Sequence, residues 1–306
     1  MFRKTLFVAL LVVLTLAACG PVVPSNTAAG LTLTDGLGRQ VQLESAAGRV
    51  VSLAPSNTEI LFALGAGEKV VGRDKFSDYP EEAKAIASVG GSMGEYSLEA
   101  IVALKPDLVL ASELNSPELV SSLEKLGLTV YYLPNPKSLE ELYTNLETVA
   151  TLTGRDATKL TDSLKARVTA VDEKIATLSY APTVFYEIDA TDPSKPYTAG
   201  VDTFINLIIN RAGGVNFTEL AGITDAYPQV SLEQLVVMPP DFIILGDSMW
   251  GTTPEVVAGR PGWDALTAVI EGRVYPFDDN LVSRPGPRLV DGLEALAKLL
   301  HPEVFK

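Results

Sequence analysis

Two stretches of the chain, SLEAIVALKPDLVL at Ser97–Leu110 and SLEQLVVMPPDFII at Ser231–Ile244, align at an offset of 134 residues. Six of the fourteen positions are identical, and six of the other eight pairs are apolar in both copies. Background composition would give roughly one identity. Each copy is typical of a helix, a Pro-Asp turn and a short buried strand, so we expect two equivalent lobes.

Around the first copy, short apolar runs alternate with amphipathic segments, which indicates strands that pair in parallel through helical crossovers. An alternating pattern over 31–43 predicts a hairpin at the edge of this lobe. Ser56 and Glu59 fit the S-x-x-E capping box at the start of the first helix. The predicted strands are Val50–Ala54, Lys69–Gly72, Asp107–Ala111 and Thr129–Leu133, and the predicted helices cover about 57–64, 97–104 and 117–126.

The same alternation of short apolar runs and amphipathic segments returns after Pro182 and predicts a second α/β lobe. Trp263, in Pro-Gly-Trp at the start of a helix, is predicted to lie in the core of this lobe. The predicted strands are Thr183–Ile188, Phe242–Leu245 and Val274–Phe277, and the predicted helices cover about 202–212, 231–237, 263–270 and 287–300.

Between the lobes, one apolar stripe with helical spacing predicts a single long helix from about Arg155. Its members are Leu160, Leu164, Val168, Val171, Ile175 and Leu178. Some 24 residues would span about 36 Å, enough for a strut between two lobes; an ordinary surface helix of one domain is the alternative. The expected fold is α/β, with two Rossmann-like lobes with parallel sheets at 31–152 and 181–306 joined by a backbone helix within 153–180.

The first 18 residues have a basic start and a short apolar stretch, Leu6–Leu16, which is typical of a secretory signal. The stretch is shorter than the roughly 20 residues that a membrane-spanning helix needs. Leu16-Ala17-Ala18-Cys19 resembles the lipobox of bacterial lipoproteins, which predicts that Cys19 is acylated; a buried free cysteine is the alternative. Residues 19–30, rich in small and polar residues, are predicted to be a flexible tether.

Composition excludes several classes of function. The 24 Lys and Arg residues face 38 Asp and Glu residues, and the net charge of −14 argues against binding nucleic acid. One cysteine excludes an internal disulfide, and one histidine, His301, cannot build a site for a bare metal ion. Asp278-Asp279, a carboxylate pair at a predicted strand end, has no partner base. We therefore predict no catalytic residues, no resident metal and no cofactor, against the alternative of a bilobal enzyme.

The repeat places Glu99 and Glu233 at corresponding positions, each one turn into a helix. A carboxylate there gains about 0.3–1 kcal/mol from the helix dipole, which would explain either residue alone. Two exposed acidic points on two matching lobes also suit one symmetric basic partner.

Five segments together resemble the solute-binding proteins of bacterial ABC importers for metal chelates. They are Arg49–Glu59, Ser77–Pro80, Ser97–Asp107, Tyr227–Gln234 and Arg284–Arg288. The resemblance implies a class III periplasmic-binding-protein-like fold outside the cytoplasm, with vitamin B12, a ferric siderophore or haem in the cleft. It also implies that Glu99 and Glu233 dock on arginines of the permease, which works with its ATPase.

The segments at Ser77–Pro80 and Tyr227–Ser231 are most similar to the vitamin B12 branch. This similarity favours a corrinoid as the ligand. Against it, this chain has Ser92-Met93 and Asn280-Leu281 where that branch has tryptophans, so a ferric siderophore or haem stays open. A flat chelate needs aromatic faces and a few polar anchors. The candidate ligand-binding residues are Phe76, Tyr79, Met93, Tyr96, Tyr197, Trp250 and Arg284, with core packing or a solvated loop charge as the alternative for each.

We expect a monomer that is held at the cell membrane by its lipid anchor only. The alternative is a lipoprotein that senses a ligand for a membrane receptor without transporting it. The sequence features suit both classes, except that the paired glutamates favour an importer.

Overall fold

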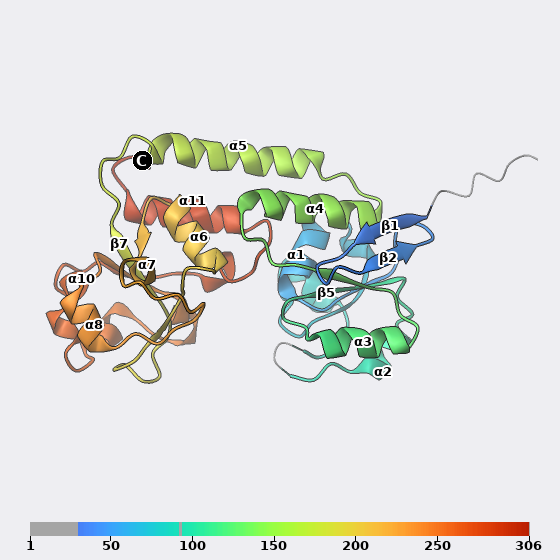
Figure 1. The fold of residues 1–306 in the computed structure, drawn as a ribbon, viewed down its shortest axis with the longest axis horizontal. Coiled ribbons are helices and arrows are strands. Elements are labelled where there is room, and N and C mark those ends of the chain that lie inside the picture. Colours follow the sequence, from blue (N-terminus) through green and yellow to red (C-terminus); the bar gives the residue numbers. More distant parts are fainter. Residues whose placement is uncertain (1–29, 92–93, 306) are drawn as a thin grey trace, which may run out of the picture.

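The computed structural model describes residues 30–91 and 94–305. It has two α/β lobes that lie side by side and are bridged along one side by helices (Figure 1). This confirms the predicted fold class. The predicted signal peptide and Cys19 lie outside the described residues. None of the helices in the described part is long and apolar enough to cross a membrane.

The N-terminal lobe is built on a four-stranded parallel sheet with the strand order β4-β3-β5-β6. The predicted hairpin is present as a separate antiparallel pair, β1 and β2, and the Gly36 N–H in its turn donates to the Tyr132 carbonyl of β6 at 2.8 Å. The strands are β1 (Leu31–Thr34), β2 (Gln40–Leu43), β3 (Val50–Ser52), β4 (Val70–Arg73), β5 (Leu108–Ser112) and β6 (Val130–Leu133), and the helices are α1 (Pro55–Ala63), α2 (Leu98–Ala103), α3 (Pro117–Lys125) and α4 (Leu139–Thr153), with 3₁₀ turns at Gly67–Lys69 and Glu81–Ala85.

The predicted capping box at the start of α1 was wrong. The N-cap residue is Ala54, and no side chain caps the helix. Pro55 occupies the first turn, where its fixed φ favours a helix start, so Ser56 and Glu59 lie inside the helix. Glu59 is thereby free to make contacts with the other lobe.

The C-terminal lobe has a five-stranded sheet with the order β11-β10-β7-β8, and β9 also pairs with β7. Only β8 runs antiparallel. Trp263 is fully buried, as predicted, and its indole N–H donates to the Pro193 carbonyl. The strands are β7 (Thr183–Asp189), β8 (Tyr197–Thr198), β9 (Val215–Asn216), β10 (Phe242–Leu245) and β11 (Val274–Pro276), and the helices are α6 (Phe204–Arg211), α7 (Phe217–Leu220), α8 (Leu232–Val237), α9 (Pro254–Ala258), α10 (Thr267–Ile270) and α11 (Leu289–Leu300), with 3₁₀ turns η3 (Gly246–Trp250), η4 (Trp263–Ala265) and η5 (Asp279–Leu281).

One predicted helix of this lobe, at 263–270, is in fact two short pieces, η4 and α10. Leu266 between them has an extended backbone, with φ −74° and ψ 132°, and it is fully buried. The chain therefore turns at a core residue, which periodicity does not reveal.

The internal repeat is confirmed as a repeat of structure. Helix α2 and strand β5 begin 134 residues before α8 and β10, respectively. The aspartate of the Pro-Asp turn makes an equivalent hydrogen bond in both copies. Asp107 accepts from the Arg49 N–H before β3 at 2.9 Å, and Asp241 accepts from the Thr183 N–H of β7 at 2.8 Å. Each aspartate thus fixes the start of the strand beside its own.

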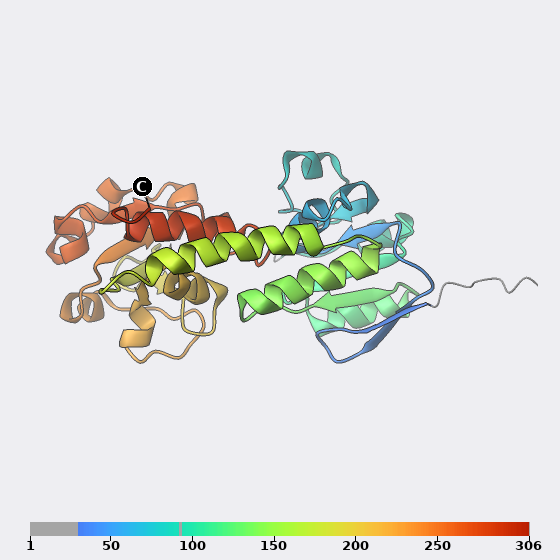
Figure 2. The same cartoon turned by 90° about the horizontal axis from the view of Figure 1, so that it is seen from above.

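The predicted helix between the lobes is present as α5 (Thr158–Ile175), which extends over both lobes (Figures 1 and 2). It is shorter than predicted, at 18 residues or about 27 Å. Gly154, in the left-handed region with φ 65°, ends α4, and α5 starts only at Thr158. The helix ends at Ile175, so Leu178, the last residue of the predicted apolar stripe, lies beyond it.

Helix α5 packs on both lobes. The Lys165 ammonium lies 5.1 Å from the centre of the Tyr143 ring on α4, and Arg167 pairs with Asp291 and Glu294 on α11. A single apolar cluster runs through α4, α5, α6 and α11 and one face of each sheet. The lobes therefore share one hydrophobic core along this side of the molecule.

Candidate functional site

The carboxyl ends of the parallel strands of both lobes meet at an interlobe cleft, which is where open α/β sheets bind ligands. One cavity there, of about 210 Å³, has walls from both lobes. A neighbouring cavity of about 510 Å³ shares four of its wall residues. The shared residues are Leu114, Asn135, Phe204 and Tyr227.

The cleft combines apolar surface with neutral polar groups. Leu114 and Tyr227 expose more than half of their surface. The side chains of Ser56, Asn135 and Ser283 line the cavities and have no hydrogen-bond partner among the described residues. These groups are therefore free to bond a ligand.

The charged residues of the cleft are mostly acidic. Glu113, Asp202 and Asp279 line the two cavities, and Lys137 is the only cation among their described lining residues. Partial desolvation of the Tyr227 phenol, and then the nearby charges of Asp279 and Glu113, raise the pKa of this group. Tyr227 is therefore a neutral phenol at physiological pH.

Three of the predicted ligand-binding residues lie at strand ends but outside the walls of these cavities. Phe76 follows β4, Tyr197 lies on β8, and Trp250 ends η3. All three are exposed, and Trp250 is the most exposed of them, at 78%. Their contact with a ligand stays a prediction.

Tyr96 is held inside the N-terminal lobe. Its hydroxyl lies 2.8 Å from both the Leu53 carbonyl and the Asp74 carboxylate, and it accepts from the Asn115 amide. This network fixes the loops at the strand ends of the lobe. Met93, which is also a predicted ligand-binding residue, lies outside the described residues.

Arg284 belongs to a network that joins the lobes, here called the interlobe ion cluster: Glu59, Asp78, Arg284 and Arg288. Arg288 makes two bonds to Glu59, at 2.8 and 2.5 Å. Arg284 reaches Glu59 at 3.2 Å and Asp78 at 2.7 Å. Burial alone would raise the pKa of Asp78, but the bond to Arg284 and its charge outweigh burial and lower it. The guanidinium of Arg284 therefore already has partners.

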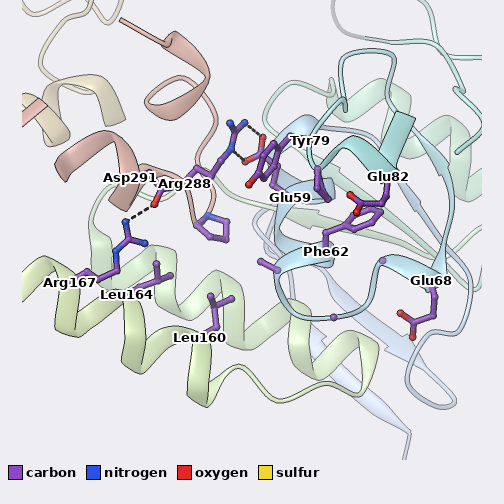
Figure 3. Close-up of a pocket in the computed structure, with 15 residues that line it drawn as sticks. Glu59, Phe62, Glu68, Tyr79, Glu82, Leu160, Leu164, Arg167, Arg288 and Asp291 are labelled. Carbon is purple, nitrogen blue, oxygen red and sulfur yellow. Dashed lines mark hydrogen bonds and ion pairs between the residues drawn. The ribbon is translucent and has the colours of Figure 1, made fainter. Parts of the chain in front are cut away.

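The interlobe ion cluster borders another cavity, outside the cleft and here called the back cavity, of about 640 Å³ (Figure 3). Its walls come from α1, α5 and the start of α11, and include Phe62, Leu160 and Leu164. Tyr79 lines this back cavity and not the cleft, and the Arg288 guanidinium lies 4.0 Å from the centre of its ring. Its role in ligand binding stays a prediction.

The two predicted docking residues, Glu99 and Glu233, are both exposed in the first turns of α2 and α8. Ser97 and Ser231 cap these helices by accepting from backbone N–H groups. Neither glutamate has an ion-pair partner within 30–91 and 94–305. Both helices lie on the side of the molecule away from α5 (Figure 1).

Sequence reasoning missed Leu114, Asn135 and Tyr227 as wall residues. Leu114 and Asn135 each come two residues after a strand ends, at Ser112 and Leu133. The rule that ligands lie at the carboxyl ends of parallel strands could have found them. In the described part of the chain, no group of three His, Cys, Asp or Glu side chains could hold a metal ion.

Comparisons with known proteins agree with this architecture. The family model described as "Periplasmic binding protein" matches residues 50–281. The uncharacterized ABC transporter substrate-binding lipoprotein YvrC of Bacillus subtilis is 36% identical, over 90% of this chain and 87% of that protein. The cobalamin-binding protein of Halobacterium salinarum is 31% identical, over 89% of this chain and 74% of that protein.

A similar solved structure is the periplasmic heme-binding protein RhuT from Roseiflexus sp. RS-1 in apo form. Its TM-score is 0.74 at 27% identity, and the match covers 85% of this chain and 99% of that one. These matches span the body of the chain and both lobes. The chain therefore belongs to the periplasmic binding protein family and is a solute-binding protein of an ABC importer, with cobalamin- and haem-binding proteins among its relatives.

Proposed function

We propose that this protein is a lipid-anchored extracytoplasmic receptor that delivers a metal chelate, with a corrinoid favoured, to an ABC permease and its ATPase. The observation that carries the choice of ligand is the character of the interlobe cleft, which is apolar, rich in neutral hydrogen-bonding groups and short of cations.

The charge of the cleft separates the candidate chelates. A catecholate siderophore and haem, with its propionates, bring negative charge toward Glu113, Asp202 and Asp279, with Lys137 as the single opposing cation among the described wall residues. Like charges that meet in an interface cost affinity. A corrin ring instead carries neutral amide groups around an apolar plane, which suit Ser56, Asn135 and Ser283.

A further observation weighs against haem. The single histidine, His301, is buried beyond the end of α11, 3.2 Å from the Gly213 carbonyl, and lines neither cleft cavity. A ferric siderophore with little net charge is the second candidate, because the charge argument does not exclude it.

Cyanocobalamin is expected to quench the tryptophan fluorescence of the purified protein with a saturable curve. Trp250 is exposed and Trp263 is buried in the core, so Trp250→Ala should remove most of the signal while equilibrium dialysis still detects binding. Tyr227→Ala should weaken binding about tenfold, because a large aromatic wall is lost. Tyr180→Ala is the matched control, since Tyr180 is exposed and lines neither cleft cavity.

Haem, a catecholate siderophore and a hydroxamate siderophore serve as competing ligands in the same assay. Saturation by a ferric siderophore with no response to cobalamin would show that the corrinoid assignment is wrong. Tight binding of free iron or zinc would contradict the chelate hypothesis itself.

The lipid anchor is tested separately. Cys19→Ala is expected to release the protein from the membrane fraction, because acylation of this residue is the proposed attachment. The Bacillus subtilis relative is itself named a lipoprotein, which supports the proposal. Fractionation after a high-salt wash measures the effect, and a variant that stays with the membrane would overturn the anchor.

A further inference from the structure

The smaller of the two cleft cavities, of about 210 Å³, has one charged residue among its described wall residues, Asp279. Asp279 begins η5, which follows strand β11 of the C-terminal lobe. Its carboxylate has no ion-pair partner in the described part of the chain. A single negative charge therefore lines a cavity whose other described walls are neutral.

A buried phenol orients this carboxylate. The Tyr186 hydroxyl on β7 donates to Asp279 Oδ1 at 2.8 Å. Tyr186 is 1% exposed, and its ring packs edge-on against Phe277. Gly246 leaves room for the phenol, because a Cβ at that position would lie only 2.8 Å from the Tyr186 hydroxyl oxygen. The fold thus holds one oxygen of Asp279, and Oδ2 has no donor among the described residues.

The bond to Tyr186 explains why an acceptor is present at this position, but it does not explain a charge. A buried hydroxyl needs one acceptor, and the carbonyl oxygen of an asparagine would serve. Burial, then the charge and hydrogen bond of Asp279, and then the charges of Asp278 and Asp247, raise the pKa of the Tyr186 phenol. Several carboxyl groups therefore lie near one phenol, and a further donor at Asp279 would offset their mutual repulsion.

A second polar group lines the same cavity from the other lobe. Ser56, on α1, is 6% exposed, and its hydroxyl has no hydrogen-bond partner among the described residues. A polar side chain that is this deeply buried normally has a partner. The cavity therefore offers a bound ligand an acceptor at Asp279 and a free hydroxyl at Ser56.

We propose that Asp279 is a specificity-determining residue, which accepts a hydrogen bond from a peripheral carboxamide of the chelate and excludes chelates with a carboxylate in its place. A carboxamide has N–H donors for Asp279 and a carbonyl oxygen for Ser56, whereas a carboxylate has only acceptors and the same charge as Asp279. The ligand class is a fully amidated corrinoid. The proposal rests on the proposed function and narrows it.

Selection of this kind works mainly by rejection. Two carboxylates repel each other when they meet inside a cavity whose described walls hold no cation. A site built to bond an N–H group also rejects an analogue without that group far more strongly than an apolar pocket rejects an extra methylene group. The bond from Tyr186 strengthens the rejection, because it prevents Asp279 from turning away from the ligand.

The test measures Kd values of the purified full-length protein by equilibrium dialysis. The ligands are cyanocobalamin and its isomeric monocarboxylic acids, in each of which one propionamide of the corrin ring is hydrolysed. At least one isomer is expected to bind the wild type about thirtyfold more weakly than cyanocobalamin does. The ratio of the two Kd values is the measure of specificity.

Asp279→Asn should reduce this ratio to about threefold, because asparagine keeps an acceptor for Tyr186 and can donate to a carboxylate. The affinity of the variant for cyanocobalamin should fall only about threefold, since an amide can still bond a carboxamide. Tyr186→Phe keeps the charge of Asp279 and removes the bond that orients it, so the ratio should fall to about tenfold. Retained cyanocobalamin binding shows that each variant is folded.

Asp225→Asn is the matched control. Asp225 is exposed and lines neither cleft cavity, so this variant should keep the ratio of the wild type. An equal fall in the ratio for Asp225→Asn would show that the overall acidity of the protein excludes carboxylates, and would overturn the assignment to Asp279.

The other outcomes separate this proposal from the proposed function. Equal affinity of the wild type for cyanocobalamin and all its monocarboxylic acids would overturn the role of Asp279 and leave the corrinoid receptor intact. A large ratio that Asp279→Asn does not change would also overturn that role. Saturation by a ferric siderophore with no binding of cyanocobalamin would instead overturn the proposed ligand, and the specificity proposal with it.

Discussion

Glu59→Ala is expected to lower the free energy of unfolding by about 3–5 kcal/mol, because it removes the carboxylate at the centre of the interlobe ion cluster. Glu59 is 3% exposed and accepts from both Arg284 and Arg288. Arg284 would keep its ion pair with Asp78, but Arg288 would be left against Tyr79 without an ion-pair partner. A buried charge that loses its partner is among the most costly changes in a protein.

Urea unfolding monitored by circular dichroism measures the change. Glu68→Ala is the matched control, because Glu68 lies nearby in sequence and pairs with Arg155 at the surface. An exposed pair contributes at most about 1 kcal/mol, so the control should stay close to the wild type. A loss below about 1 kcal/mol for Glu59→Ala would show that the cluster does not hold the lobes together.

The interlobe ion cluster and the shared hydrophobic core both connect the two lobes. The cluster connects α1 of the N-terminal lobe to the segment before α11, and α5 packs on both α4 and α11. Ser283 and Pro285 of that segment line the cleft, while Pro287 and Arg288 line the back cavity. The segment before α11, which connects the two lobes, therefore also forms part of the ligand site.

The sequence predicted the strands and the repeat because both depend on local patterns. Every predicted strand is present to within two residues at either end, since short apolar runs between turn residues have few other structures open to them. The repeat was visible because the same helix, Pro-Asp turn and strand must bury the same positions in each lobe. These signals need no knowledge of how the lobes meet.

The contacts between the lobes could not be predicted in this way. Glu59 fits a capping box by its neighbours alone, while its real partners lie 225 and 229 residues further along the chain. The cleft walls at Leu114 and Tyr227 likewise come together only when the lobes are placed. The sequence was enough to assign an exposed aromatic residue such as Trp250 to a loop. It did not indicate which loops of the two lobes face each other.

The stability of the protein is expected to fall as the pH rises from about 5 to 8 through the titration of one buried carboxyl group, Glu187. Glu187 is fully buried on β7 and accepts two bonds from Arg260, at 2.6 and 2.8 Å. Burial raises its pKa to about 7 despite Arg260, and the charge of Asp247 adds to the effect. Asp247 is also buried, and its Oδ1 has no hydrogen-bond partner within the described residues.

Two carboxylates thus share one guanidinium, so the cluster is neutral only while it holds a proton. The unfolded chain releases that proton near pH 4.5, whereas the folded chain holds it up to about pH 7. Between these values the native state binds more protons, and the free energy of unfolding falls as the pH rises. From pH 5.5 to 8 the Glu187 contribution should decrease by about 2 kcal/mol.

Glu187→Gln should remove this dependence, because Asp247 alone then balances the charge of Arg260. Relative to the wild type, the variant is expected to lose stability at pH 5.5 and to recover about 2 kcal/mol of the difference by pH 8. Urea unfolding at both pH values gives the comparison, because the two proteins differ only at position 187. Glu173→Gln, at an exposed position of α5, should show no such trend. A constant difference between Glu187→Gln and the wild type would mean that Glu187 stays ionised in the native state, with Arg260 alone compensating for its burial.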